Sequence, residues 1–213
     1  MKLARNMVIG ATILGIFAVV GTILLGLIHD ATIDRIRANQ RATVLRTLHI
    51  LIPPERHDND LFTDVIRVRD PLLQIDGEAV AIYRARRGEQ AVAAILTAIA
   101  PDGYNGNIDL LVAVNYDGTL AGVGVTRHLE TPGLGDGIDR RKSDWIHVFD
   151  GRSLDDPPEQ QWGVRKDGGY FDQLTGATIS PRAVVKAVRN ALIYYREHRE
   201  EIFATPAEAT TDE

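Results

Sequence analysis

The segment DQLTGATISP places a threonine hydroxyl where it could meet an anion. Ser180 fits an N-cap and Pro181 suits the first helical position, so Thr178 lies just before a predicted helix start. Helix N-termini present unpaired N–H groups and a partial positive charge, which suits a phosphate group. Gly176 and Ala177 are small enough for a phosphate to lie against the backbone. The same pattern also fits a simple strand-to-helix turn with a Thr or Ser cap.

A second segment, RHLETPGLGDGI, combines the polar residues His128, Glu130 and Thr131 with a proline and glycines. Proline and glycine would fix a loop with exposed backbone groups, which suits contact with a flat ligand. No serine or cysteine nucleophile with a recognisable local signature accompanies His128, which disfavours a hydrolase. The carboxylates of the segment match the spacing of no calcium loop. The segment is therefore predicted to bind a ligand and not to be a hydrolytic centre.

The elements that must position these segments are strands before them and a helix after them. Apolar runs at about 79–84, at 90–100 and at 108–115 predict strands, and Asp117-Gly118 predicts a tight hairpin after the third. The residues expected to pair across this antiparallel sheet are Val112, Val114, Val123 and Val125. A C-terminal helix is predicted by apolar residues at helical spacing, namely Val184, Val185, Val188, Leu192 and Tyr195. The stretch 130–161 is loop-like, and its part from 137 to 161 is either a partner-facing surface or an ordinary irregular loop.

The N-terminal part of the chain predicts a membrane anchor. Residues 7–28 carry no charged side chain and are long enough, at about 1.5 Å per residue, to cross a hydrocarbon core of roughly 30 Å. A removed signal peptide is the alternative, but its apolar region is usually shorter. Helical spacing continues from 31 to 52 and ends at Pro53-Pro54, which predicts a stalk. Basic residues flank the span on both sides and favour neither orientation: Lys2, Arg5, Arg35, Arg37, Arg41 and Arg46.

Composition excludes several classes of function. The chain has 213 residues, which suits one main domain, and a formal net charge of -5, which gives no support for nucleic-acid binding. It has no cysteine, so it can form no disulfide and ligate no iron–sulfur cluster. Its six histidines are scattered and without paired spacing, so no structural zinc or other metal site is expected.

Together the motifs resemble a known family. HLETPGLGD, followed by DGGYFDQLTGATISPRAVVKAV, resembles the FMN-binding domain of the RnfG protein of the Rnf (Rsx) electron transport complex, and the resemblance covers nearly the whole chain. In that family a flavin transferase attaches FMN through a phosphoester to the last threonine of a D-x-x-[S/T]-G-A-T motif. The motif here consists of Asp172, Gln173, Leu174, Thr175, Gly176, Ala177 and Thr178. The resemblance thus implies FMN esterified to Thr178.

The resemblance implies further roles and partners. The isoalloxazine ring is expected at the loop from His128 to Gly135, with Leu134 as an apolar contact and His128, Glu130 and Thr131 as polar groups. The chain would be a redox subunit without a complete active site, in a complex of six subunits that couples ferredoxin/NAD electron transfer to ion movement across the bacterial inner membrane. The soluble domain would face the periplasm.

The resulting expectation is an α+β fold with an antiparallel-rich sheet and a C-terminal helix. Its parts are a cytoplasmic N-terminus (1–6), a transmembrane helix (7–28), a helical stalk (29–54), an FMN-binding domain (55–203) and a disordered tail (204–213). Two alternatives stay open: the flavin-carrying C-subunit of the related sodium-pumping NADH:quinone oxidoreductase, or a membrane-tethered binding domain without a cofactor.

Overall fold

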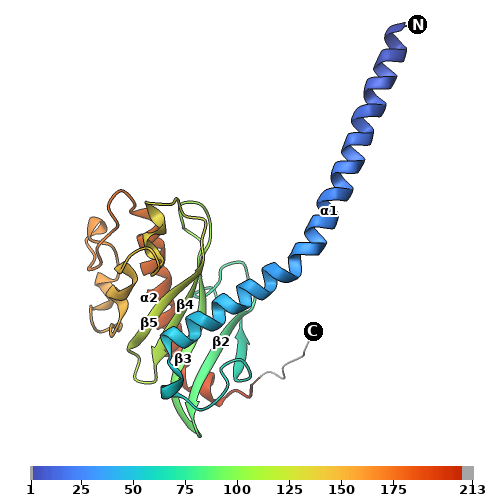
Figure 1. The fold of residues 1–213 in the computed structure, drawn as a ribbon. Coiled ribbons are helices and arrows are strands. Elements are labelled where there is room, and N and C mark those ends of the chain that lie inside the picture. Colours follow the sequence, from blue (N-terminus) through green and yellow to red (C-terminus); the bar gives the residue numbers. More distant parts are fainter. Residues whose placement is uncertain (1, 208–213) are drawn as a thin grey trace. The chain divides into compact units, whose positions relative to one another are not determined.

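The computed structural model describes the backbone of residues 2–207, and all side chains within it except those of residues 2–4, 8, 30, 34, 37, 40 and 41. The chain divides into two compact units, 1–43 and 44–213. The end of the tail predicted to be disordered, 208–213, lies outside the described residues. The elements in chain order are drawn in Figure 1.

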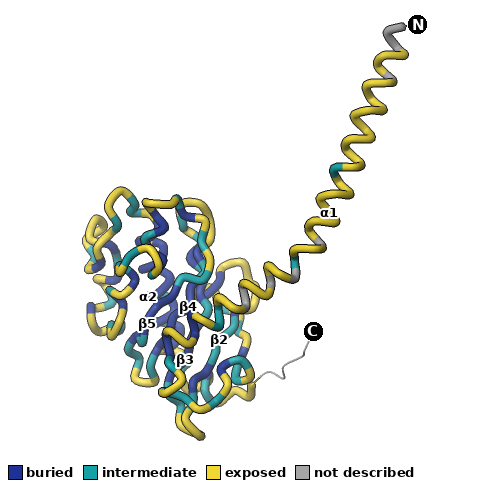
Figure 2. The backbone as a smooth tube through the Cα atoms, viewed as in Figure 1, coloured by how far each residue is buried: buried dark blue, intermediate teal, exposed yellow. Residues whose placement is uncertain are grey.

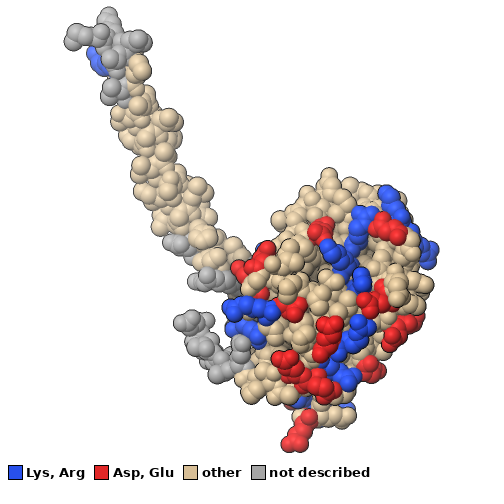
Figure 3. Space-filling view, turned by 180° about the vertical axis from the view of Figure 1, so that it is seen from behind, with Lys and Arg blue, Asp and Glu red and all other residues tan. Residues whose placement is uncertain are grey.

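The first unit consists of the N-terminal part of one long helix, α1 (Lys2–Leu51). Residues Arg5–Ile33 are long and apolar enough to form a candidate membrane span. The described side chains along this stretch are almost all exposed, and residues 7–28 include no charged residue. The face of the helix seen in Figure 3 is accordingly tan over most of its length. A helix that is apolar on every face is suited to lipid and not to water.

The second unit is built on one antiparallel sheet of five strands in the order β1-β2-β3-β4-β5. The strands are β1 (Val65–Val68), β2 (Val80–Arg87), β3 (Gln90–Ala100), β4 (Ile108–Asn115) and β5 (Leu120–Arg127). The predicted bounds of β3 and β4 are confirmed, whereas β1 was not predicted. The fold class predicted from the sequence, α+β with an antiparallel sheet and a C-terminal helix, is confirmed.

One face of the sheet packs against the C-terminal helix α2 (Ile179–Ala204). The apolar residues predicted at helical spacing on α2 are buried there, together with alternate residues of β3 and β4 (Figure 2). Val112 pairs with Val123, and Val125 pairs with Leu110 in the same register, whereas a bulge between Ala113 and Val114 places Val114 opposite Leu120. All four valines nevertheless pack in this core cluster.

The other face of the sheet is covered by the last turns of α1, from Val44 onward. Leu48, Leu51 and Ile52 are buried against small residues of β2, β3 and β4. The backbone of β5 lies close to the end of α1 at Gly124, because a Cβ added there would overlap the Cγ2 of Thr47. The second unit is therefore three layers thick, with the sheet between two helical segments.

Between β5 and α2 the chain forms four short 3₁₀ helices, which are η2 (Gly135–Ile138), η3 (Trp145–Phe149), η4 (Glu159–Gln161) and η5 (Arg165–Asp167). An aromatic cluster anchors this region to the core. Phe149 is stacked on Trp162 with ring centroids 6.2 Å apart, and Phe171 lies 5.0 Å from Phe149 and 4.9 Å from Trp162. The long loop predicted from the sequence is thus an ordered layer.

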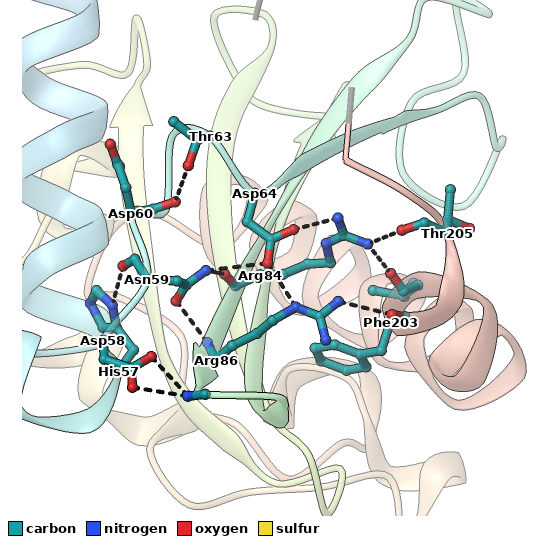
Figure 4. A network of polar contacts seen from close by, with 12 residues as sticks. His57, Asp58, Asn59, Asp60, Thr63, Asp64, Arg84, Arg86, Phe203 and Thr205 are labelled. Atoms are coloured by element: carbon teal, nitrogen blue, oxygen red, sulfur yellow. Dashed lines mark hydrogen bonds and ion pairs between the residues drawn. The ribbon is translucent and has the colours of Figure 1, made fainter. Parts of the chain in front are cut away.

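A network of arginines fixes the C-terminal end of α2 (Figure 4). The buried guanidinium of Arg84 donates to the carbonyl oxygens of Ile202, at 2.9 Å, and Thr205. Arg86 donates to the Phe203 carbonyl at 2.8 Å, and the carboxylate of Asp64 pairs with both arginines. Cations at a helix C-terminus are favoured by the helix dipole and by its unpaired carbonyl groups. The network therefore ties α2 to β2.

Asp64→Asn should lower the free energy of unfolding by about 2–4 kcal/mol, because it leaves two largely buried guanidinium groups without their carboxylate. Urea unfolding of the full chain in detergent, followed by tryptophan fluorescence, measures the change, since both tryptophans lie in the aromatic cluster. Asp102→Asn is the matched control, because its ion pair with Lys186 is exposed and should contribute only about 0–1 kcal/mol. If the free energy of unfolding fell equally in the two variants, the buried network would stabilise the fold no more than an exposed ion pair does.

Candidate functional site

A cavity of about 330 Å³ lies at the start of α2, within the size range of small-ligand sites. Three chain segments form its wall: the turn between β3 and β4, the loop after β5, and the first turn of α2 with the residues before it. The lining residues are Tyr104, Glu130, Thr131, Leu134, Gly135, Gly176, Ala177, Thr178, Ile179 and Ser180.

Thr178 is the N-cap of α2, and the helix begins at Ile179. The prediction that Ser180 is the N-cap and Pro181 the first helical residue is therefore wrong by two positions. Among the described residues, the Thr178 side chain makes no capping hydrogen bond to the helix. Its hydroxyl is thus not used by the helix start, and Ile179 and Ser180 carry N–H groups that have no partner in the preceding turn of helix.

A tight turn presents Thr178 at the cavity. The N–H of Ala177 donates to the carbonyl of Leu174 at 3.1 Å, and Gly176 adopts a φ of +79°, which side-chain-bearing residues rarely adopt. A Cβ at Gly176 would lie 3.2 Å from the Cδ2 of Leu134, so this turn and the loop after β5 are in close contact. The Gly-Ala pair therefore allows the tight turn and also lets this turn lie close to Leu134.

Glu130 and Ser180 join the loop after β5 to the first turn of α2. Their side chains are 4% and 1% exposed, and the Ser180 hydroxyl donates to the Glu130 Oε2. The Glu130 Oε1 accepts from the backbone N–H of Asn105 at 3.3 Å. A Cβ at Gly135 would lie 2.5 Å from the Ser180 Oγ and 2.6 Å from the Glu130 Oε2, so only glycine fits against this hydrogen bond.

The loop that carries Thr131 and Leu134 is held by its own polar groups. The N–H of Leu134 donates to the Thr131 carbonyl at 3.1 Å, and the N–H of Gly133 donates to the Asp136 Oδ1 at 2.8 Å. The Asn105 side chain donates to the Thr131 Oγ1 at 3.2 Å. These bonds leave Leu134 47% exposed beside Tyr104 and Ile179, which are 64% and 41% exposed. Apolar surface of this kind around a cavity suits an aromatic ligand.

His128 does not line the cavity. Its Nδ1 accepts from the backbone N–H of Glu130 at 3.2 Å, and its Nε2 lies 3.9 Å from the Oδ2 of Asp139. The hydrogen bond at Nδ1 leaves Nε2 as the ring nitrogen that faces Asp139. Asp139 is buried and hydrogen-bonded to the Arg141 guanidinium at 2.5–3.1 Å. Burial by itself would raise the pKa of Asp139, but the hydrogen bonds and charge of Arg141, with a smaller contribution from His128, hold that pKa below its ordinary value.

Asp172 and Thr175 are exposed and do not line the cavity. The Asp172 carboxylate lies 3.1 Å from the Arg165 guanidinium, and its carbonyl accepts from the Trp145 Nε1 at 2.6 Å. Arg182, in the first turn of α2, donates to the Asp167 carboxylate at 2.5 and 2.9 Å. The guanidinium of Arg182 is therefore already paired with a carboxylate.

The structure brings together part of the site predicted from the sequence. The predicted residues that line the cavity are Glu130, Thr131, Leu134, Gly176, Ala177 and Thr178, and those outside its lining are His128, Asp172 and Thr175. Gly135 ends the loop that was predicted to hold the flavin ring, and Ile179 ends the turn that was predicted to hold the phosphate. Sequence reasoning missed Tyr104 and Ser180 as lining residues. An aromatic residue within the turn-rich PDGYNGN was the one available signal for Tyr104.

Comparisons with known proteins cover nearly the whole chain. The model of the FMN-binding domain matches residues 103–193, which include every lining residue of the cavity, and that of the RnfG N-terminal region matches residues 1–51. The G-subunit of the ion-translocating oxidoreductase complex of Pseudomonas aeruginosa is 49% identical over 98% of this chain and 97% of its own length. The G-subunit from Shewanella loihica is 45% identical, over 95% and 96%.

The chain belongs to the family of G-subunits of ion-translocating oxidoreductase complexes. It is thus part of a redox complex and carries an FMN-binding domain, as the sequence predicted. The cavity residues fit FMN: a glycine turn at an uncapped helix start can receive a phosphate, and an exposed aromatic and aliphatic rim can contact a flavin ring.

Asp139→Asn should lower the free energy of unfolding by about 1–2 kcal/mol at pH 7, because it removes the carboxylate that Arg141 binds. A carboxyl whose pKa is lower in the folded chain adds stability that is fully present above the unfolded pKa and is lost as the pH falls through the folded pKa. The difference between wild type and variant should therefore be constant from about pH 7 to 5 and shrink below about pH 4.

Urea unfolding at each pH, followed by tryptophan fluorescence, measures that difference. Asp155→Asn is the control, because Asp155 is exposed and its substitution should change the unfolding free energy by less than about 0.5 kcal/mol. A loss for the Asp139 variant that is as large at pH 3 as at pH 7 would show that the carboxylate charge does not stabilise the fold.

Proposed function

We propose that the chain relays electrons through FMN attached covalently to Thr178 by a phosphoester. The observation that carries this is the cavity around Thr178, which lies wholly inside the segment matched by the FMN-binding domain model. The D-x-x-[S/T]-G-A-T motif ends at this residue, and its hydroxyl is not used to cap the helix among the described residues. A flavin transferase would form the ester during maturation from an activated flavin nucleotide: the Thr178 oxygen would bond to the flavin phosphorus, the phosphoanhydride bond would break, and the nucleoside monophosphate and the hydroxyl proton would leave.

The chain's own residues would bind and orient the cofactor. The first N–H groups of α2 and the turn at Gly176 would hold the phosphate, and the exposed side chains of Tyr104, Leu134 and Ile179 would contact the flavin ring. Thr131 and Glu130 would supply polar contacts. His128, Asp172 and Thr175 would act from outside the cavity lining, His128 by accepting from the Glu130 backbone. FMN supplies electron acceptance and donation when it is bound, and the protein supplies its position.

As a relay, the chain depends on other subunits. It contains no cysteine and so cannot ligate iron–sulfur clusters, and it lacks the glycine fingerprint of a dinucleotide-binding strand and helix. Oxidation of ferredoxin or NADH would therefore take place elsewhere in a complex of six subunits that couples electron transfer to ion translocation. No role in nucleic-acid binding is proposed.

For the topology, we propose a single pass through the bacterial inner membrane by residues 7–28, with 1–6 in the cytoplasm. A stalk over 29–54, the FMN-binding domain over 55–203 and the acidic tail over 204–213 would then lie in the periplasm. The candidate span within α1 supports the anchor. Basic residues on both flanks do not decide the orientation, which is taken from the resemblance to the family.

Thr178→Ala should abolish covalent flavin, because it removes the only atom proposed to carry the ester. The full chain is produced together with its flavin transferase, and flavin fluorescence is recorded on the band after denaturing electrophoresis. Thr119→Ala, which changes a threonine in the β4–β5 turn, should keep the label. A colourless wild-type band, or a fluorescent Thr178→Ala band, would overturn the proposed linkage.

A reporter fused to the C-terminus should be active only when the reporter works after export, such as alkaline phosphatase. A reporter that works only in the cytoplasm should be inactive at the same position. The reverse pattern of activities would place the soluble domain in the cytoplasm and overturn the proposed topology while leaving the flavin assignment intact.

A further inference from the structure

The cavity has an unusual charge for a phosphate-binding site. Among the described residues that line it, Glu130 is the only charged side chain, and its charge is negative. No lysine, arginine or histidine is part of that lining. Phosphate sites commonly place arginine or lysine against the phosphate oxygens. In this cavity the partial positive charge at the start of α2 is the group that would attract a phosphate.

The Glu130 carboxylate is held rigidly beside that helix start. It is 4% exposed and accepts hydrogen bonds from the Ser180 hydroxyl, on the second residue of α2, and from the backbone N–H of Asn105. None of the ion pairs that join described residues includes Glu130. Gly135 packs directly on the bond between Glu130 and Ser180, so the carboxylate has no room to turn away.

Three basic residues that are near the lining segments in the sequence are engaged with carboxylates outside the cavity lining. Arg182 is bound to Asp167 through two hydrogen bonds. Lys142 lies 3.9 Å from Asp136, and Lys186 pairs with Asp102 at 2.5 Å. A phosphate in the cavity would therefore meet a weak positive potential from the helix and the full negative charge of one buried carboxylate.

We propose that Glu130 selects the charge of the ligand: it disfavours the dianionic phosphate of free FMN and accepts a monoanionic phosphodiester or a neutral flavin. This rests on the function proposed above. A phosphate monoester carries a charge of about −1.5 to −2 at pH 7, whereas a diester carries one negative charge. Each added charge near a fixed carboxylate raises the electrostatic energy, and more so where water is excluded. Free FMN therefore binds the apoprotein weakly, and esterification at Thr178 both lowers the charge and retains the cofactor.

The test uses the full-length apoprotein in detergent, produced in a host without flavin transferase. Riboflavin, FMN and the methyl phosphodiester of FMN are titrated, and binding is followed by flavin fluorescence. Wild type binds the diester more tightly than FMN. Glu130→Gln keeps the shape but removes the charge, so its ratio of FMN affinity to riboflavin affinity is roughly tenfold higher than that of wild type. Glu197→Gln, an equal charge change at an exposed position of α2, leaves the ratio of FMN to riboflavin affinity as in wild type.

An unchanged or lower ratio of FMN to riboflavin affinity in Glu130→Gln overturns the proposal. If Glu130→Gln does not fold, the wild-type comparison decides: equal affinities for FMN and its methyl diester overturn the proposal, and tighter binding of the diester supports it. Covalent labelling of Thr178 by the transferase is scored separately. If wild type is labelled at Thr178 but Glu130→Gln has the same ratio of FMN to riboflavin affinity as wild type, the charge selection is wrong and the proposed function is not affected.

Discussion

The hydrogen bond from the Ser180 hydroxyl to the buried Glu130 carboxylate holds together the segments that make the cavity. Ser180 belongs to α2 and Glu130 to the loop after β5, and the other carboxylate oxygen accepts from Asn105 in the turn between β3 and β4. Three segments distant in sequence thus meet at one carboxylate. If one of these hydrogen bonds were removed, an oxygen of the buried Glu130 carboxylate would be left without a hydrogen-bond donor. The same bond requires glycine at position 135, which explains one glycine of the TPGLG motif by contact and not by turn geometry.

The first turn of α2 reaches this carboxylate because the helix is fixed at its far end and along its length. Arg84 and Arg86 bind the carbonyl groups at its C-terminus, and its apolar face packs on the sheet. Arg84 and Arg86 come from β2, so the position of the cavity is tied to a strand that is paired on both sides within the sheet. On the opposite face the end of α1 rests on β5 over the flat surface that Gly124 provides. A helix held at its C-terminus by cations and at its N-terminus by a hydroxyl–carboxylate bond has little freedom to slide.

The sequence predicted the strands, the C-terminal helix and the Thr178 turn because each depends on a local pattern. Runs of apolar and β-branched residues gave the bounds of β3 and β4, whereas β1 has four residues with Arg67 among them and carries no clear pattern. The predicted start of α2 is wrong because serine is a common N-cap residue, but the hydroxyl of Ser180 donates to Glu130, fifty residues earlier in the chain. The direction in which His128 points depends on Asp139 and the Glu130 backbone, contacts that no spacing rule contains.

The charges around the cavity offer a reason why FMN would be held by a covalent bond to Thr178. A helix start offers roughly half a positive charge, and the buried carboxylate opposes it, so the site carries little net attraction for a phosphate. A non-covalent site of this kind would lose its cofactor on dilution, whereas an ester at Thr178 makes retention independent of affinity. The shape of the cavity would then serve to position the ring and not to retain it. In the proposed arrangement, the exposed side chains of Tyr104, Leu134 and Ile179 would keep part of the flavin near the surface. An open rim of this kind suits a protein whose task is to pass electrons to neighbours, since a buried ring would be farther from any partner.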